Sequence, residues 1–146
     1  MRYTLQVQYI GKNYAGSQIQ FENGKEIETP TIQGELEKAI STLIFGKTEN
    51  NNRQIKTIFS GRTDRGVNSE GQTVHFDTDK SIVASKFIYS LNEILPDDIS
   101  VTNLKQVDSR FHAQKSAKKR YYRYVFINRK CKNAFDGDLL RIKYDI

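Results

Sequence analysis

The sequence predicts an α+β fold in which an antiparallel sheet carries its helices on one face. Three observations support this prediction. Segments with an apolar residue at every second position alternate with segments of helical periodicity. Two predicted strands follow each other without a helix between them, as in a hairpin. The 146 residues are 37% hydrophobic and show no internal repeat or linker, so we expect one domain over residues 1–146.

An alternating stretch opens the chain, with apolar residues at Tyr3, Leu5, Val7 and Tyr9. This period of two predicts a strand with one buried face. The ten residues from position 11 are rich in turn formers, and we interpret them as a connection. Their G-x-x-x-x-G spacing resembles a phosphate loop, but the Lys-Ser/Thr pair that should follow is absent.

Two helices are predicted from their caps and apolar stripes. Thr31 can cap a helix over Ile32–Phe45, and Gly46 can end it. A second helix is predicted over Ile82–Leu95, with Pro96 after its last turn. Each helix has apolar residues at helical spacing on one side, which indicates a face directed at the core.

The remaining strands complete the order β-α-β-β-α-β-β. They are predicted over Ile55–Phe59, Gln72–Phe76, Ile99–Val107 and Arg120–Ile127. We interpret Lys47–Gln54 and Ser60–Gly71 as loops. Strands that are partly hairpin-linked, with helices between the others, favour an α+β sandwich of the ferredoxin-like kind.

Charge is unevenly distributed along the chain. The net charge is +6, and the pI is near 9.4. Residues 110–132, which we call the basic segment, contain 9 basic residues and no acidic ones. Such a segment attracts phosphates, so binding of a polyanion is one interpretation. A solvated basic face without a ligand is the alternative.

Several classes of protein are excluded by what the sequence lacks. No stretch has the ~18 consecutive apolar residues of a membrane helix, and the first residues lack the apolar core of a signal peptide. The lone Cys131 allows no internal disulfide and no cysteine zinc site. His75 and His112 are too few for a metal site. We therefore expect a cytoplasmic protein and no metal site built on cysteine or histidine.

The loop between the second and third strands contains the sequence SGRTDRGV. Asp64 lies between Arg62 and Arg65, and an adjacent guanidinium favours the ionised form of a carboxylate. The flanking glycines allow the backbone to bend and a ligand to approach closely. A reactive carboxylate at the end of a strand is one interpretation. An ordinary turn held by an Arg–Asp pair is the other.

The basic segment also carries aromatic residues beside its cations. If the segment is a strand, Tyr122 and Tyr124 share one face, and Tyr121 and Arg123 share the other. Aromatic rings next to cations suit unstacked bases and their phosphates. Packing in the core is the alternative, and we expect it for half of these tyrosines.

Five stretches of the chain resemble one family in the same order. They are RYTLQVQYIGKNYAGSQIQ, TIQGELEKAI, SGRTDRGV with GQTVHF, SLNEILPDDISV, and SRFHAQKSAKKRYYRYVFIN. On these motifs the chain resembles the N-terminal half of the TruA-type tRNA pseudouridine synthases. Members of that family have a second half, so we expect the C-terminal half to be absent from this chain.

The resemblance implies a fold, a reaction and partners. The fold is the ferredoxin-like, RRM-like half of the pseudouridine synthase fold. The reaction is the isomerisation of uridine to pseudouridine in the anticodon stem-loop of tRNA, without metal or cofactor. The implied partners are tRNA and a second copy in a homodimer, with no membrane. The chain alone is expected to be weak or inactive, because the second half adds a further cation to the active cleft.

The resemblance also implies roles for matched residues. Asp64 matches the catalytic aspartate and would be the nucleophile, and Arg62 matches an arginine that engages the substrate and flips the base. Tyr122 matches a tyrosine that packs against the target base. By charge, RNA contacts are expected from Arg65, Lys118, Lys119, Arg120 and Arg123. Asn68-Ser69 stand where the family has His-Ala, so a histidine-dependent contact is lost or replaced.

Two hypotheses that place the chain in other functional classes remain open. The chain can be an RNA-binding module without catalytic activity of its own, since it keeps the basic segment but not a closed cleft. It can also be an interaction or regulatory domain with no nucleic-acid role. An unpaired half-fold further predicts an exposed apolar face of the sheet, which would drive self-association.

Overall fold

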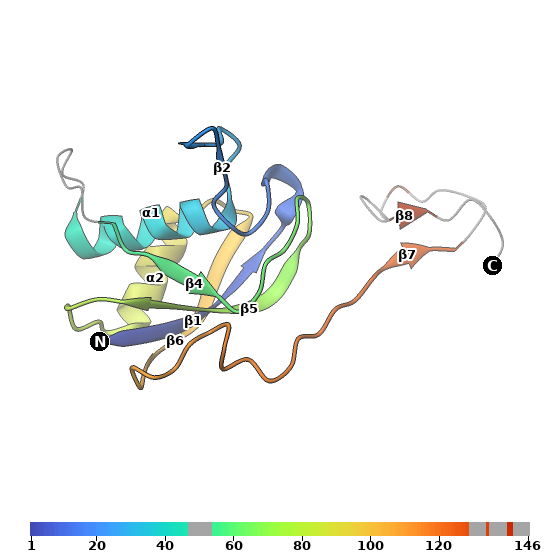
Figure 1. Ribbon diagram of the computed structural model, residues 1–146. Coiled ribbons are helices and arrows are strands. Elements are labelled where there is room, and N and C mark those ends of the chain that lie inside the picture. Colours follow the sequence, from blue (N-terminus) through green and yellow to red (C-terminus); the bar gives the residue numbers. More distant parts are fainter. Residues whose placement is uncertain (47–53, 129–133, 135–139, 142–146) are drawn as a thin grey trace.

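The computed structural model describes residues 1–46, 54–128, 134 and 140–141. Its main sheet has four antiparallel strands in the order β4-β5-β1-β6. These strands are β1 (Arg2–Tyr9), β4 (Thr57–Phe59), β5 (Ser69–Asp77) and β6 (Ile99–Val107). Helices α1 (Ile32–Phe45) and α2 (Ala84–Ile94) pack on one face of the sheet (Figure 1). The predicted α+β class is confirmed, with the β-α-β-β-α-β order of a ferredoxin-like unit.

The core lies between the sheet and the two helices. The four apolar residues of the alternating stretch form its sheet side, and none is more than 4% exposed. The buried helical residues include Leu36, Ile40, Ile44 and Leu91. Helix α1 begins as predicted, because the Thr31 hydroxyl accepts a hydrogen bond from the Gly34 backbone N–H (3.1 Å). In the described part of the chain, no helix has the length and the apolar character that a membrane span requires.

The face of the sheet away from the helices is mostly polar, although Ile58 of β4 lies on it and is 39% exposed. On β1, Gln6 lies opposite Thr73 of β5, and Gln8 lies opposite Ser100 of β6. Residues directly opposite each other in an antiparallel pair share a face. The predicted exposed apolar face is therefore wrong, because the alternation that directs apolar residues of β1 to the helices directs polar ones outward.

Two predicted elements keep their type but change length. The second helix is shorter than the predicted Ile82–Leu95, and β5 is longer than the predicted Gln72–Phe76. β4 begins two residues later than predicted. The loop predicted over Lys47–Gln54 lies, apart from Gln54, outside the described residues, and so does Cys131.

A short hairpin precedes α1 and was not predicted. Strands β2 (Phe21–Glu22) and β3 (Lys25–Glu26) pair antiparallel. Asn23 and Gly24 join them with φ values of 51° and 76°. An Asn-Gly pair with two positive φ values is typical of a two-residue hairpin turn, so the sequence does contain the signal.

The strand predicted over Arg120–Ile127 is wrong for most of its length. Only Phe126–Ile127 form a strand, β7, which pairs in parallel with β8 (Leu140–Arg141). The expectation that half of the neighbouring tyrosines pack in the core is also wrong, because Tyr121, Tyr122 and Tyr124 are 87%, 71% and 90% exposed. Strand propensity reflects packing against neighbours, and residues 121–125 have no strand beside them among the described residues.

Candidate functional site

The loop between β4 and β5 opens onto a surface pocket of about 280 Å³. Arg62, Thr63, Asp64 and Arg65 line one side of this pocket. The other side is lined by the turn before the β2–β3 hairpin, through Ala15, Gln18, Ile19 and Gln20. The structure thus brings the three charged residues of the predicted site together, and Asp64 is exposed to the pocket.

The charged residues of the loop share the pocket without pairing. In the part of the chain that the structure describes, no ion pair joins Asp64 to Arg62 or Arg65. The loop turns back after Asp64, where the Val67 backbone N–H donates to the Asp64 carbonyl (3.2 Å) and Gly66 has φ +80°. The Arg–Asp pair that the sequence suggested is not formed, and all three charged residues line the open pocket.

Buried polar groups hold the start of the loop. The Tyr9 and Thr63 hydroxyls are hydrogen-bonded (2.8 Å), and the Gln72 amide donates to the Tyr9 hydroxyl (2.8 Å). The Gln72 side-chain oxygen Oε1 accepts from the Gly61 backbone N–H (2.9 Å). Burial raises the pKa of Tyr9, so its hydroxyl keeps its proton at neutral pH. Sequence reasoning assigned Tyr9 to the core only and overlooked Gln72, a polar residue at an inward position of a strand.

Asn68 fastens the end of the loop to a short 3-10 helix, η1 (Gly11–Asn13). Its side-chain oxygen accepts a hydrogen bond from the Gly11 backbone N–H (2.8 Å). A Cβ at Gly11 would lie 2.1 Å from the Val67 carbonyl oxygen, so only glycine allows this approach. Asn68, which departs from the family motif, therefore has a contact of its own.

The basic segment contacts the first residue of the same loop, Ser60. The Arg120 guanidinium donates twice to the Ser60 carbonyl, from Nε (3.1 Å) and from Nη2 (2.7 Å). Arg123 forms an ion pair with Glu70. Lys118 and Lys119 are exposed and have no partner among the described residues. Arg120 thus holds the backbone rather than presenting a fully free cation.

The structure does not bring the aromatic part of the segment to the pocket. Tyr122 is 71% exposed, and it is not among the residues that line the pocket. In Figure 1 the chain passes from β6 along the side of the sheet away from the helices and then extends toward β7. The predicted site is therefore assembled at Arg62, Asp64 and Arg65, but not at Tyr122.

Comparison with known proteins finds several relatives that carry the same name. No protein-family model matches the chain. A tRNA pseudouridine synthase A from Bacillus licheniformis is 45% identical over 125 residues, which are 86% of this chain and 46% of the relative. Proteins of the same name from Bacillus subtilis (42% over 135 residues) and Colwellia psychrerythraea (39% over 134 residues) each match 92% of this chain.

The matches cover most of this chain but only part of each relative. The aligned residues are 50% of the Bacillus subtilis protein and 47% of the Colwellia psychrerythraea protein. The chain therefore spans about half the length of the curated relatives it matches. The predicted resemblance is confirmed: along about nine tenths of its length, this chain is homologous to the tRNA pseudouridine synthases A.

Proposed function

We propose that this chain carries the catalytic carboxylate for the isomerisation of uridine to pseudouridine in tRNA. In this reaction the bond between C1′ and N1 of the nucleotide breaks, and a bond between C1′ and C5 forms. N1 gains a proton, and C5 loses one, so no oxidant or reductant is consumed. The names of the homologous proteins support this reaction class.

The observation that carries the proposal is the position of Asp64. Asp64 lines an open pocket together with Arg62 and Arg65, on the loop whose sequence resembles the family motif. Ala15 and Ile19 add apolar surface to the same pocket, against which a base can pack. A nucleotide in folded RNA is stacked, so it must be extruded before a pocket of this kind can receive it. Asp64 then acts as the nucleophile, and Arg62 engages the extruded nucleotide.

The remaining cations contact the phosphates of tRNA in this proposal. Arg65 lies at the pocket, and Lys118, Lys119 and Arg123 continue along the exposed segment. Arg120 contributes through its hold on Ser60 as well as through its charge. Tyr122 reaches the target base only if the exposed segment moves toward the pocket. The anticodon stem-loop as target, the cytoplasm and the homodimer stay predictions.

A hybrid protein tests the assignment of Asp64. In it, this chain replaces the matching half of the Bacillus subtilis relative, with which it shares 42% identity. We expect the hybrid to form pseudouridine in a uridine-containing tRNA transcript, measured by mass spectrometry of the digested RNA. Asp64→Ala should abolish the product and leave tRNA affinity nearly unchanged, because the carboxylate acts in chemistry rather than in phosphate binding.

Asp79→Ala is the matched control, since Asp79 is also an exposed aspartate but lies outside the pocket. It should leave product formation intact. Normal turnover by the Asp64→Ala hybrid, or no product from the unmutated hybrid, would end the assignment.

An RNA-binding module without independent catalysis is a second candidate. It is favoured by the exposed cations after β6, among them Lys118 and Lys119. The affinity of the chain for tRNA should then fall steeply with salt, because phosphate contacts release counterions. Filter binding at low and high salt measures this. No retention of tRNA even at low salt would favour an interaction domain with no nucleic-acid role.

A further inference from the structure

One buried serine, Ser17, forms two hydrogen bonds with the backbone of Thr63, the residue that precedes Asp64. The Ser17 backbone N–H donates to the Thr63 carbonyl (3.0 Å), and the Ser17 hydroxyl accepts from the Thr63 backbone N–H (2.8 Å). Ser17 is only 1% exposed, so water does not compete for these bonds. A single residue therefore satisfies both backbone groups of the residue that precedes Asp64.

The neighbouring glycine brings the two segments into close contact. Gly16 has φ +126°, and a Cβ at this position would lie 2.8 Å from the Thr63 carbonyl oxygen. The same Cβ would lie 3.6 Å from backbone atoms of Asp64 and Arg65. Only glycine allows this approach without displacement of the loop. The turn at residues 16–17 and the Asp64 loop thus pack backbone against backbone.

The start of α1 fixes this turn. The first N–H groups of a helix have no partner inside the helix. Here the Ile32 N–H donates to the Gly16 carbonyl (3.3 Å), and the Gln33 N–H donates to the Ser17 carbonyl (2.9 Å). The helix terminus is therefore hydrogen-bonded to the same two residues that hold the loop.

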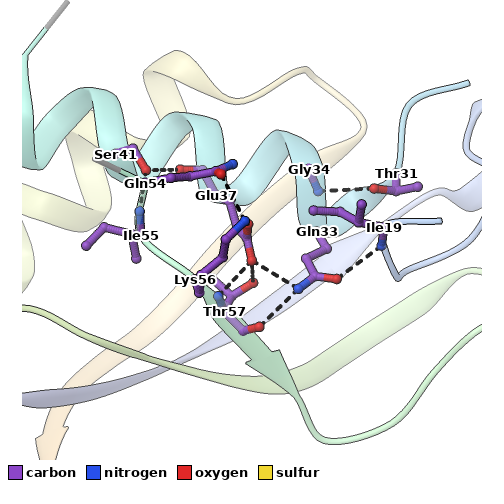
Figure 2. A network of polar contacts seen from close by, with 10 residues as sticks. All are labelled: Ile19, Thr31, Gln33, Gly34, Glu37, Ser41, Gln54, Ile55, Lys56 and Thr57. Carbon is purple, nitrogen blue, oxygen red and sulfur yellow. Dashed lines mark hydrogen bonds and ion pairs between the residues drawn. The ribbon is translucent and has the colours of Figure 1, made fainter. Parts of the chain in front are cut away.

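The Gln33 side chain adds a second connection, which Figure 2 shows. Its oxygen accepts from the Ile19 backbone N–H (3.1 Å), and Ile19 lines the pocket. Its nitrogen donates to the Glu37 carboxylate and to the Thr57 carbonyl (3.0 Å each). The pocket wall is thus linked to α1 and β4 by groups that the proposed reaction does not use.

We propose that Ser17 is a positioning residue for Asp64. Ser17 acts through the backbone of Thr63 and fixes the loop relative to α1. A carboxylate that attacks a substrate must be held close to one position. Asp64 has no ion pair in the described residues, so the hold on the adjacent backbone sets its place. The catalytic consequence rests on the proposed function, whereas the hydrogen-bonded clamp does not.

Amide exchange in the 146-residue chain tests the clamp directly. Ser17→Ala removes the acceptor for the Thr63 N–H, so exchange of that amide should accelerate by about tenfold. Ser41→Ala is the matched control, because the Ser41 hydroxyl accepts from the Ile55 N–H (2.9 Å) away from the pocket. It should accelerate exchange at Ile55 and leave Thr63 unchanged. Unchanged exchange of Thr63 in Ser17→Ala would overturn the inference.

The hybrid tests the catalytic consequence. Ser17→Ala should lower the rate at saturating tRNA by about tenfold or more and leave tRNA affinity unchanged, since a misplaced carboxylate affects chemistry rather than binding. Ser41→Ala should keep the full rate. Cysteine is a weaker acceptor, so the rate of Ser17→Cys should lie between the rates with serine and with alanine. Ser17→Cys replaces Ser17→Ala in the experiment if the alanine variant does not fold.

The two proposals fail in different ways in this experiment. A full rate in Ser17→Ala, together with an inactive Asp64→Ala, would overturn the positioning role and leave the proposed function standing. A full rate in Asp64→Ala would overturn the proposed function and with it the catalytic consequence of the clamp.

Discussion

At the scale of single residues, Gly16 is a position where the backbone leaves no room for a side chain. Gly16→Ala combines an unfavourable φ of +126° with a Cβ at 2.8 Å from the Thr63 carbonyl oxygen. We expect it to lower the free energy of unfolding by more than about 1 kcal/mol, measured by urea denaturation. Gly71→Ala is the control, because its Cβ would meet only the Gln6 side chain at 4.0 Å. Equal midpoints for the two variants would contradict this.

At the scale of elements, a buried carboxylate joins α1 to the edge strand β4. Glu37 is fully buried, and its Oε1 accepts from the backbone N–H (2.8 Å) and the hydroxyl (3.1 Å) of Thr57. Glu37→Ala leaves both donors unsatisfied, so we expect a loss of about 3 kcal/mol in the free energy of unfolding. Lys56→Ala should cost at most about 1 kcal/mol, because this partner of Glu37 is an exposed side chain. Chemical denaturation of both variants measures the difference, and equal losses would assign the stabilisation to the ion pair instead.

At the scale of the whole molecule, the chain after β6 is fastened to the outer face of the sheet through His75. Its Nδ1 accepts from the Ala113 backbone N–H (3.1 Å), and Arg2, Asp77 and His112 face it. Burial lowers the pKa of His75 below its usual value of 6.5, and the positive charge of Arg2 lowers it further. The unfolded chain then binds more protons, so stability should fall as the pH drops below 6.5 toward the folded pKa.

Urea midpoints at about pH 5.5 and about pH 7.5 measure this dependence. His75→Asn can keep an acceptor for Ala113 but does not titrate, so it should flatten the dependence. The pKa of Asp77 is also lowered, by its hydrogen bond from Arg2, but that contribution is lost only below the usual carboxylate range. A wild-type midpoint that is equal at both pH values would contradict the role of His75.

The fold was predictable where local patterns and packing agree. The alternation in β1 and the cap and stop of α1 lead to the bounds that the structure shows, because burial of one face enforces each period. The segment before β7 has equally strong strand propensity, but strands form by pairing. Propensity alone does not show that residues 121–125 have no neighbour, so that prediction failed.

The sequence predicted the residues of the candidate site but not the contacts that hold them. The motif around Asp64 places its charged residues on one loop, since consecutive residues necessarily stay together. Ser17 contacts that loop from 46 residues earlier in the sequence, and Gln72 contacts it from the strand that follows. Their roles depend on tertiary contacts that appear only when α1 and the sheet are in place.

Arg120 connects the basic segment to the start of the Asp64 loop. Its two hydrogen bonds to Ser60 join positions that are 60 residues apart. Under the proposed function, a polynucleotide bound to residues 118–123 would compete with Ser60 for the Arg120 guanidinium. Loss of the two hydrogen bonds would free the backbone at the start of the Asp64 loop, so RNA binding and the position of Asp64 would be coupled.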